Sequence, residues 1–369
     1  MPHVHNEFGY LADELVLEVM RRMPSLYDRW NMMHCCARFA TIQTASGASG
    51  LLGDLTTAQR EQNAFTATMH GHDLLLNALL MAGVSSRTMY RNTVTLLMVA
   101  AKEGHLLCVR ALLTAGSDVE ASCCRGDLFY RRGEIGFPFG RHQQCKRDTA
   151  LMIASKCGHV LCVGALLVAG SSPNTASPDG STALMSAARF GQYLCTCALL
   201  EARSDPHMVD DDGKTALMHA ALHGHVSCLN ALLEAGSDPN FLEDYDDDTP
   251  LMLAAAIGND QCVNALLAAR ADPNKVNHNS DTALLLAADE MAGSVRSRAL
   301  PVRPDKDPGM RYHECLIALI NAGADLNKQD GLGNTALHKA LKGGCDLCVT
   351  ALIDAGSDLE IRNEHGETA

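Results

Sequence analysis

The sequence predicts an all-α solenoid, a stack of short helical repeats, and three observations lead to this prediction. A seven-residue signature recurs at a spacing close to 33 residues. Each copy is followed by two helix-forming stretches and a Gly-containing turn. The chain has 369 residues, beyond the roughly 250–300 at which one ordinary core stops growing. A repeat array escapes that limit because each unit packs only on its neighbours.

The signature begins with a threonine and reads close to Thr-Ala-Leu-Met-x-Ala-Ala. The threonines are 54, 33, 33, 34, 33 and 53 residues apart, so two steps hold one period plus an insertion of roughly twenty residues. Repeat positions are counted from these threonines, so that +4 is four residues later. They are Thr95, Thr149, Thr182, Thr215, Thr249, Thr282 and Thr335.

One unit, residues 210–240, shows why each element is expected. Its Asp-Asp-Asp-Gly opening is typical of a turn, and the Thr215 hydroxyl is suited to cap the helix that follows. Apolar residues at i, i+3 and i+4 give that helix one buried side, and Gly224 ends it. A second helix runs through Cys228 and Leu232, and the stretch from Gly236 breaks it.

This helix–turn–helix–hairpin unit resembles the ankyrin repeat, whose period is 33 and whose first helix opens T-P-L-H-x-A. Gly-His pairs and hairpin-leading Gly-Ser-Asp or Gly-Ala-Asp sequences recur with that period. The resemblance covers residues 62–369 and implies an ankyrin-repeat α-solenoid of eight repeats and a truncated ninth. The signature's fourth residue departs from the family, because methionine replaces the usual histidine in most copies and only His338 keeps it.

Composition restricts the compartment and the partners. A formal charge of −13 disfavours nucleic acid and anionic membrane as main partners. No apolar stretch reaches the roughly 18 residues of a membrane span, and the N-terminus does not resemble a signal peptide. Seven of the fifteen cysteines occupy position +13 or its insertion-corrected equivalent, where the second helix turns inward. They are Cys108, Cys162, Cys195, Cys228, Cys262, Cys315 and Cys348. Buried thiols in a repeat position indicate a reducing compartment, the cytoplasm or the nucleus.

The concave surface is the expected partner site. In ankyrin arrays the hairpin tips and first helices line it, and by this resemblance positions +7 and +8 are its exposed pair. Near the centre of the array these positions are apolar, while the flanking hairpins are acidic, which predicts a groove for a basic, partly apolar peptide. Its residues are Arg189, Phe190, Leu222, His223, Ile257, Asp211, Asp212, Tyr245 and Asp246. The alternative is that the acidic tips are only solvated turns and the apolar residues serve repeat stacking.

The two insertions, near 123–147 and 291–311, are further candidates. The first is a basic finger with a net charge of +4, from six basic and two acidic residues, and it interleaves aromatic residues with arginine. Its named residues are Phe129, Tyr130, Arg131, Arg132, Phe137 and Phe139. A protein contact is the main interpretation, and base stacking is an alternative. A zinc site is another alternative, formed by Cys123, Cys124, His142 and Cys145. The second insertion holds three prolines and is expected to be a flexible loop.

Residues 8–40 lie outside the repeat pattern, in an N-terminal module that spans 1–45 and precedes a linker at 46–61. Their pattern resembles the F-box, a helical module that docks on the linker subunit of cullin–RING ubiquitin ligases. The matching residues are Leu11, Glu14, Leu15, Val19, Met23, Pro24, Cys36 and Phe39. Ala12 stands where the F-box usually has proline, and the second half needs a one-residue insertion. The alternative is a helical cap over the apolar flank of the first repeat.

No motif indicates catalysis: the sequence has no phosphate-cradling loop, nucleophile elbow or convincing carboxylate pair, and we expect no cofactor or metal. The leading hypothesis is that the array binds a client protein as the substrate-recognition subunit of a cullin–RING ubiquitin ligase. A plain ankyrin scaffold or inhibitor is the alternative. Nucleic-acid binding through the basic finger is a third, unfavoured class.

Overall fold

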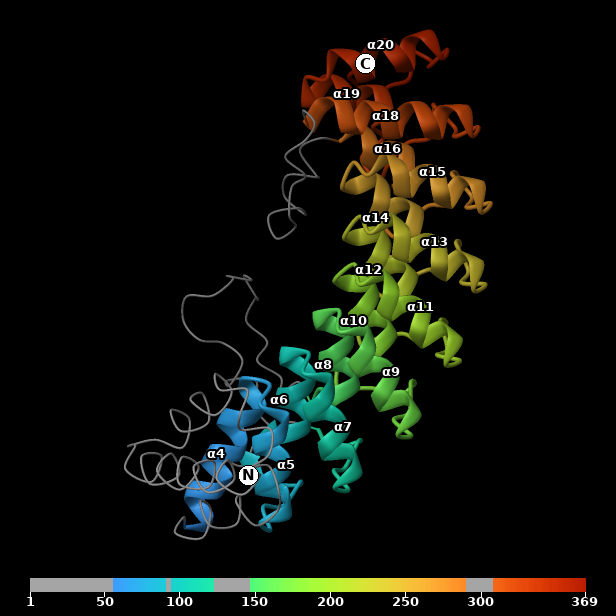
Figure 1. The fold of residues 1–369 in the computed structure, drawn as a ribbon. Helices are drawn as coiled ribbons and strands as arrows, with labels where there is room; N and C mark the ends of the chain where they lie inside the picture. The colour runs from blue at the N-terminus through green and yellow to red at the C-terminus, as the bar shows by residue number, and fades with distance from the viewer. Residues whose placement is uncertain (1–55, 91–93, 123–146, 290–307) are drawn as a thin grey trace, which may run out of the picture.

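The computed structural model describes residues 56–90, 94–122, 147–289 and 308–369 (Figure 1). Within these ranges the chain forms eight pairs of helices, stacked in chain order from one end of the array to the other. The first helices of the pairs are α4 (Thr57–Met69), α6 (Leu96–Glu103), α8 (Ala150–Cys157), α10 (Ala183–Arg189), α12 (Ala216–Leu222), α14 (Pro250–Ala256), α16 (Ala283–Ala288) and α19 (Ala336–Gly343). The second helices are α5 (Asp73–Met81), α7 (Leu106–Thr114), α9 (Val160–Val168), α11 (Tyr193–Glu201), α13 (Val226–Glu234), α15 (Asp260–Ala268), α18 (Pro308–Asn321) and α20 (Asp346–Asp354). The predicted all-α solenoid is confirmed.

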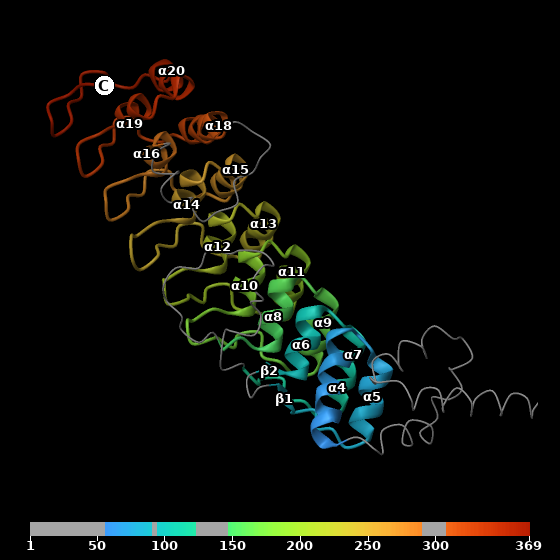
Figure 2. The ribbon, with the colours of Figure 1, turned by 90° about the vertical axis from the view of Figure 1, so that its left-hand side faces the viewer.

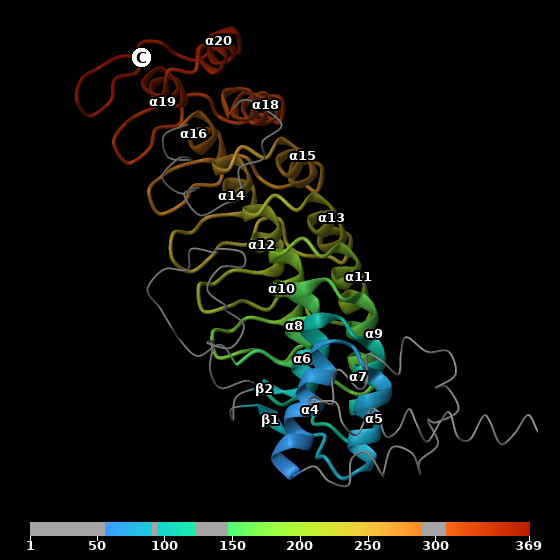
Figure 3. The same ribbon diagram turned by 60° about the vertical axis from the view of Figure 1, so that its left-hand side comes forward.

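The helices form two layers with loops along one side. Figures 2 and 3 show the hairpin loops on one side, the first helices in the middle and the second helices on the far side. Consecutive first helices contact one another, as do consecutive second helices. The hairpin after the first pair contains a short antiparallel ribbon of β1 (Met89–Tyr90) and β2 (Val94–Thr95). The array therefore has a loop-lined face and an outer face made of second helices.

The signature threonines cap the first helices as predicted. In all seven, the hydroxyl oxygen accepts a hydrogen bond from the backbone N–H three residues later, which satisfies a donor that has no partner within the helix. The methionine of the signature completes the cap in two repeats, since the N–H of Thr182 lies 3.4 Å from Met185 Sδ and that of Thr249 lies 3.5 Å from Met252 Sδ. His338 in the eighth repeat adds a link that methionine cannot make, because its Nε2 donates to the Glu367 carbonyl at 3.1 Å.

One continuous apolar cluster runs through the array. The seven repeat cysteines lie inside it and are at most 1% exposed. Burial raises the pKa of the Cys108 thiol to about 12 and that of Cys195 to about 11. These thiols remain protonated at neutral pH and act as small apolar groups.

In the second, third and fifth repeats, the histidine of the Gly-His pair joins the repeat to the one before it. The His159 Nε2 donates to the Lys102 carbonyl at 2.9 Å, and the His225 Nε2 donates to the Arg189 carbonyl at 3.1 Å. Gly104 has φ of +77°, and a Cβ there would lie 2.5 Å from Nδ1 of His159. Glycine is thus required twice at this position, by the left-handed backbone and by the ring of the next repeat.

Two boundaries differ from those that the sequence predicts. Helix α4 begins at Thr57, inside the proposed linker 46–61, with Thr56 and Gln59 forming a capping box. Helix α18 begins at Pro308, inside the proposed insertion 291–311, and its 14 residues make it longer than the other second helices. The N-terminal module and almost all of the basic finger lie outside the described residues.

Candidate functional site

Backbone hydrogen bonds join several hairpin tips into a row. The Asp211 N–H donates to the Asp179 carbonyl at 3.1 Å, and the His278 N–H donates to the Asp246 carbonyl at 2.8 Å. The same bond links Gly331 N–H to the Asn279 carbonyl at 3.0 Å. Since neighbouring tips hold one another, the side chains they carry are presented in a defined order.

The tips of the fifth and sixth repeats are acidic. The side chains of Asp211, Asp212, Asp244 and Asp246 are exposed, and Tyr245 between them is 71% exposed. The 34-residue step of the sequence places its extra residue in the second of these tips. This region combines negative charge with an accessible aromatic ring, at the positions where the sequence predicts the acidic rim of a partner groove.

The apolar floor is less exposed than the sequence suggests. Phe190, Leu222 and Ile257 lie at the ends of the successive first helices α10, α12 and α14, but all three are only partly exposed. The Lys156 ammonium lies 5.1 Å from the centre of the Phe190 ring, a cation–π contact. The sequence predicts exposed apolar side chains at these positions, and the structure corrects this to a half-buried row: Phe190 contacts Lys156 of the preceding repeat, and Leu222 packs against the core.

Three histidines gather beside this floor, and each has its own protein partner. His219 Nε2 lies 2.7 Å from Oδ2 of Asp210, which accepts the hydrogen bond. His223 donates from Nδ1 to the His219 carbonyl at 2.9 Å, while His225 bonds the Arg189 carbonyl. The His223 ring is nearly parallel to that of His225, with centroids 6.2 Å apart. Hydrogen bonds to groups of the protein thus account for the position of each ring, without a shared ligand.

Mild acid is expected to destabilise the array through His223. Burial lowers the pKa of His223 to about 4, despite its hydrogen bond to the His219 carbonyl. In the unfolded chain the imidazole takes up a proton near pH 6.5, so stability falls from about pH 6.5 to about 4 and then levels for this group. At pH 5 the loss is about 2 kcal/mol. Urea unfolding at pH 7 and pH 5 measures it, and His223→Phe, which matches the residue at this position of the preceding repeat, should remove that loss. Equal losses in both proteins would contradict the assignment.

Beneath the acidic tips lies a buried polar ladder that the sequence reading did not single out: Asp210, Lys214, His219, Glu243, Asp248 and Asn277. Lys214 forms an ion pair with Glu243 of the next repeat, whose carboxylate is 3% exposed. Asn277 Nδ2 donates to Asp248 Oδ1 at 2.8 Å, across the following interface. Burial opposes ionisation of Asp210, but the hydrogen bond and charge of His219 outweigh it and hold the Asp210 pKa below its ordinary value. These contacts tie the loop-lined face together from within.

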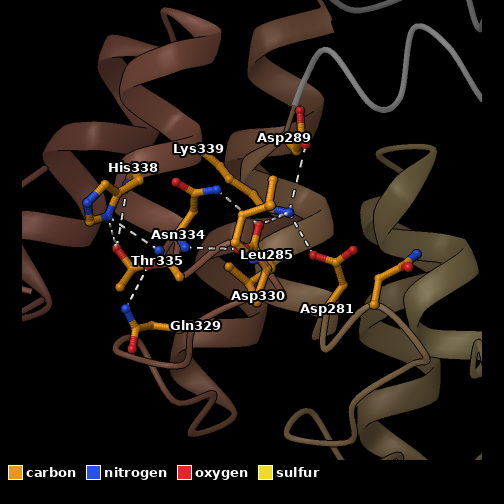
Figure 4. Close-up of polar contacts among 12 residues, drawn as sticks. Asp281, Leu285, Asp289, Gln329, Asp330, Asn334, Thr335, His338 and Lys339 are labelled. Carbon is orange, nitrogen blue, oxygen red and sulfur yellow. Dashed lines mark hydrogen bonds and ion pairs between the residues drawn. The ribbon is translucent and has the colours of Figure 1, made fainter. Parts of the chain in front are cut away.

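A second buried group, the lysine cluster, lies between the seventh and eighth repeats (Figure 4). Nζ of Lys339 is 2.6 Å from Asp281 Oδ1, 3.2 Å from Asp330 Oδ2 and 3.9 Å from Asp289 Oδ2. The Lys339 side chain is 11% exposed. Burial acts to lower the Lys339 pKa, but the hydrogen bonds and charges of Asp281 and Asp330 raise it above its ordinary value. The cluster is a buried group of charged residues that links the seventh and eighth repeats.

A sequence signal for both polar groups existed at position +4. This position is Val99, Ile153, Ser186, Leu253 or Leu286 in most repeats, yet it is His219 in the fifth and Lys339 in the eighth. An ionisable residue at a repeat position that is otherwise mostly apolar predicts a buried partner. In both repeats one partner is the aspartate five residues before the threonine, Asp210 or Asp330, and Lys339 also pairs with Asp281 of the preceding repeat.

The remaining predicted residues lie outside the described ranges. These are the finger residues, the zinc alternative and the F-box-like residues. Among the described residues, one acidic group is close enough to hold a cation, Glu243 with Asp246 and Asp248, and the Lys214 ammonium already faces it. None of the helices in the described ranges combines the length and hydrophobicity needed to span a bilayer.

Stacked helix pairs with a continuous loop-lined face define a repeat solenoid, a class that presents an extended binding surface. Models of ankyrin repeats match this chain over residues 93–123, over four overlapping stretches between 135 and 296 (three-copy model) and over 319–369 (many-copy model). The chain belongs to the ankyrin-repeat family, and its array is a protein–protein interaction module. The ankyrin repeat domain of human ASB11 is a similar solved structure, with 26% identity and a TM-score of 0.52, covering 63% of this chain and 96% of that one. No curated protein matches the chain.

Proposed function

We propose that the chain is the substrate-recognition subunit of a cullin–RING ubiquitin ligase, and that its loop-lined face binds a client protein. The client contributes a basic, partly apolar segment. The N-terminal module, with its F-box-like pattern from Leu11 to Phe39, binds the linker subunit of the ligase.

The observation that carries client binding is the half-buried row of Phe190, Leu222 and Ile257 beside the exposed acidic tips. A row of this kind lets a partner bury apolar surface without disturbing the core, and its members come from positions +7 and +8 of three successive repeats. The exposed carboxylates at Asp211, Asp212 and Asp246 favour a cationic partner and accelerate its encounter.

The polar surface of the first repeat favours a partner role for the N-terminal module over a purely capping role. Exposed residues of α4 include Gln59, Glu61 and Gln62, whereas Ala64 and Ala67 of the same helix are buried. Terminal repeats of a solenoid need a polar outer side for solubility, and α4 supplies one by itself. The apolar pattern of residues 8–40 is then available for another contact.

Affinity purification of the full chain, with crosslinking and quantitative mass spectrometry, tests this proposal. The ligase linker subunit is expected with the full chain and not with a variant lacking residues 1–45, while the client is expected with both. Absence of the linker from the full-chain sample would refute the ligase role. Retention of the client alone would then indicate the second candidate, an ankyrin scaffold or inhibitor.

A further inference from the structure

A row of exposed leucines follows the outer face of the first four repeats. Position +12 of the second helices is Leu107 in α7, Leu161 in α9 and Leu194 in α11, which are 59%, 68% and 62% exposed. Counting one period back from Thr95 places Leu74 of α5 at the same position, and it is 36% exposed. These four residues, the outer leucine row, belong to second helices, which form the layer of the solenoid away from the hairpin loops (Figure 3).

The middle of the row is formed by α9, whose outer surface is apolar from end to end. Leu161, Gly164 and Val168 are spaced i, i+3 and i+7 and share one side of the helix, and Val168 is 91% exposed. A Cβ added at Gly164 would meet nothing within 4 Å. Helix α9 contains no charged residue, so its outer surface offers leucine and valine side chains. Between them Gly164 has no side chain, which lets another backbone approach closely.

The repeat fold does not require leucine at this position. The fifth, sixth and seventh repeats carry Ser227, Gln261 and Glu314 there, in helices that stack in the same way. The row therefore ends after the fourth repeat. The chain is rich in charged residues, with a formal charge of −13, and Glu314 shows that a charged residue is compatible with this position. A contiguous exposed apolar surface that the fold does not need marks a contact site.

The N-terminal module has the length, position and pattern to cover the row. Fifty-five residues precede Thr56, and the chain enters the array at α4, whose partner α5 carries the first leucine of the row. An extended chain of that length spans up to roughly 180 Å. Helices packed about 10 Å apart put the fourth repeat only some 30 Å from the first. Leu11, Leu15 and Val19 recur at helical spacing, which gives the module an apolar face that must be buried.

We propose that the amphipathic segment of residues 8–40 docks on the outer leucine row of its own chain, over α7, α9 and α11. The row is confined to the repeats that this segment reaches most easily, and it is absent where the array continues away from it. Docking does not depend on a ligase. Since the same apolar residues belong to the F-box-like pattern, a ligase linker subunit and the outer leucine row compete for this segment.

The single tryptophan of the chain, Trp30, reports on this docking in the full-length protein. We expect Trp30 to be protected from acrylamide in the wild type and the tryptic sites at Arg21 and Arg22 to be cut slowly. Leu161→Asp with Val168→Asp should raise the quenching constant several-fold, shift Trp30 emission to the red and accelerate cleavage. Leu347→Asp is the matched control, because Leu347 occupies position +12 of the eighth repeat and is 51% exposed, yet lies outside the row.

Three results would overturn the proposal: an accessible Trp30 in the wild type, no change of either signal in the Leu161/Val168 variant, or equal changes in the control. A wild-type dimer that the same variant converts to monomer, seen by sedimentation, would assign the row to a second copy instead. Far-ultraviolet circular dichroism verifies folding, and Val168→Asp alone changes a side chain that is almost fully exposed. Loss of the ligase linker in purifications would leave these signals unchanged, so the two proposals fail separately.

Discussion

Replacing Phe190, Leu222 and Ile257 together by serine is expected to abolish client capture by the loop-lined face. Each apolar side chain at the centre of an interface contributes about 1 kcal/mol or more, so the triple variant should bind at least roughly 100-fold more weakly. The three side chains are only partly buried, and the core beneath them, including Leu217 and Leu184, is untouched. Helical content should therefore remain close to that of the wild type.

The outer leucine row supplies the matched control for this experiment. Leu107, Leu161 and Leu194 are also apolar residues of successive repeats, and replacing them by serine removes comparable apolar surface from the opposite face. Quantitative mass spectrometry of proteins bound to the two variants compares the faces directly. Client capture that persists in the Phe190/Leu222/Ile257 variant, or that is lost equally in the control, would remove the basis for the groove.

Lys339→Met is expected to unfold the C-terminal repeat at temperatures where the rest of the array stays folded. The substitution leaves the carboxylates of Asp281 and Asp330 buried without their ammonium partner, which costs about 3–5 kcal/mol. In the described part of the chain, α19 and α20 pack on the preceding repeat through α16 and α18. Since each repeat depends on its neighbours, the loss should stay local.

Hydrogen exchange measures this locality. Amides of residues 335–355 should exchange much faster in Lys339→Met, while those of α12 to α15 keep their protection. Combining Lys339→Leu with Asp281→Asn and Asp330→Asn should restore the repeat. Leu253 and Leu286 already occupy the position of Lys339 in their own repeats. Asn277 occupies the position of Asp330 in the seventh repeat and accepts the hydrogen bonds of the turn there. Uniform loss of protection along the array, or no rescue by the triple variant, would contradict the role of the cluster.

Much of the fold could be predicted because the same features recur in successive repeats, so an irregular residue in one repeat does not change the interpretation. A threonine cap, a left-handed glycine and an inward cysteine that recur with one period reinforce the same interpretation at every step, and the structure confirms each of them. The boundaries at Thr57 and Pro308 were misplaced where the period is weak or interrupted. There, one capping box or one extended helix decides the boundary, and neither recurs elsewhere in the array.

The candidate site was predicted in outline and missed in its interior. Acidic tips and an apolar centre could be read from residues 189–257, but their exposure depends on how closely adjacent repeats approach, which no single repeat specifies. Glu243 belongs to one hairpin and Lys214 to another, so their pairing follows only from stacking. The outer leucine row was overlooked because leucine in an amphipathic helix is normally assigned to the core.

By itself, the sequence determined the repeat, its helices and caps, the burial of the cysteines and the membership of an interaction family. These depend on contacts within one unit or on a position repeated in every unit. Only the tertiary structure decided which histidines, lysines and aspartates meet across repeats, how far Phe190 and its neighbours are covered, and that Leu107, Leu161 and Leu194 form one exposed row. The reason is geometric: these properties arise between units, where side chains more than thirty residues apart come within a few ångströms of one another.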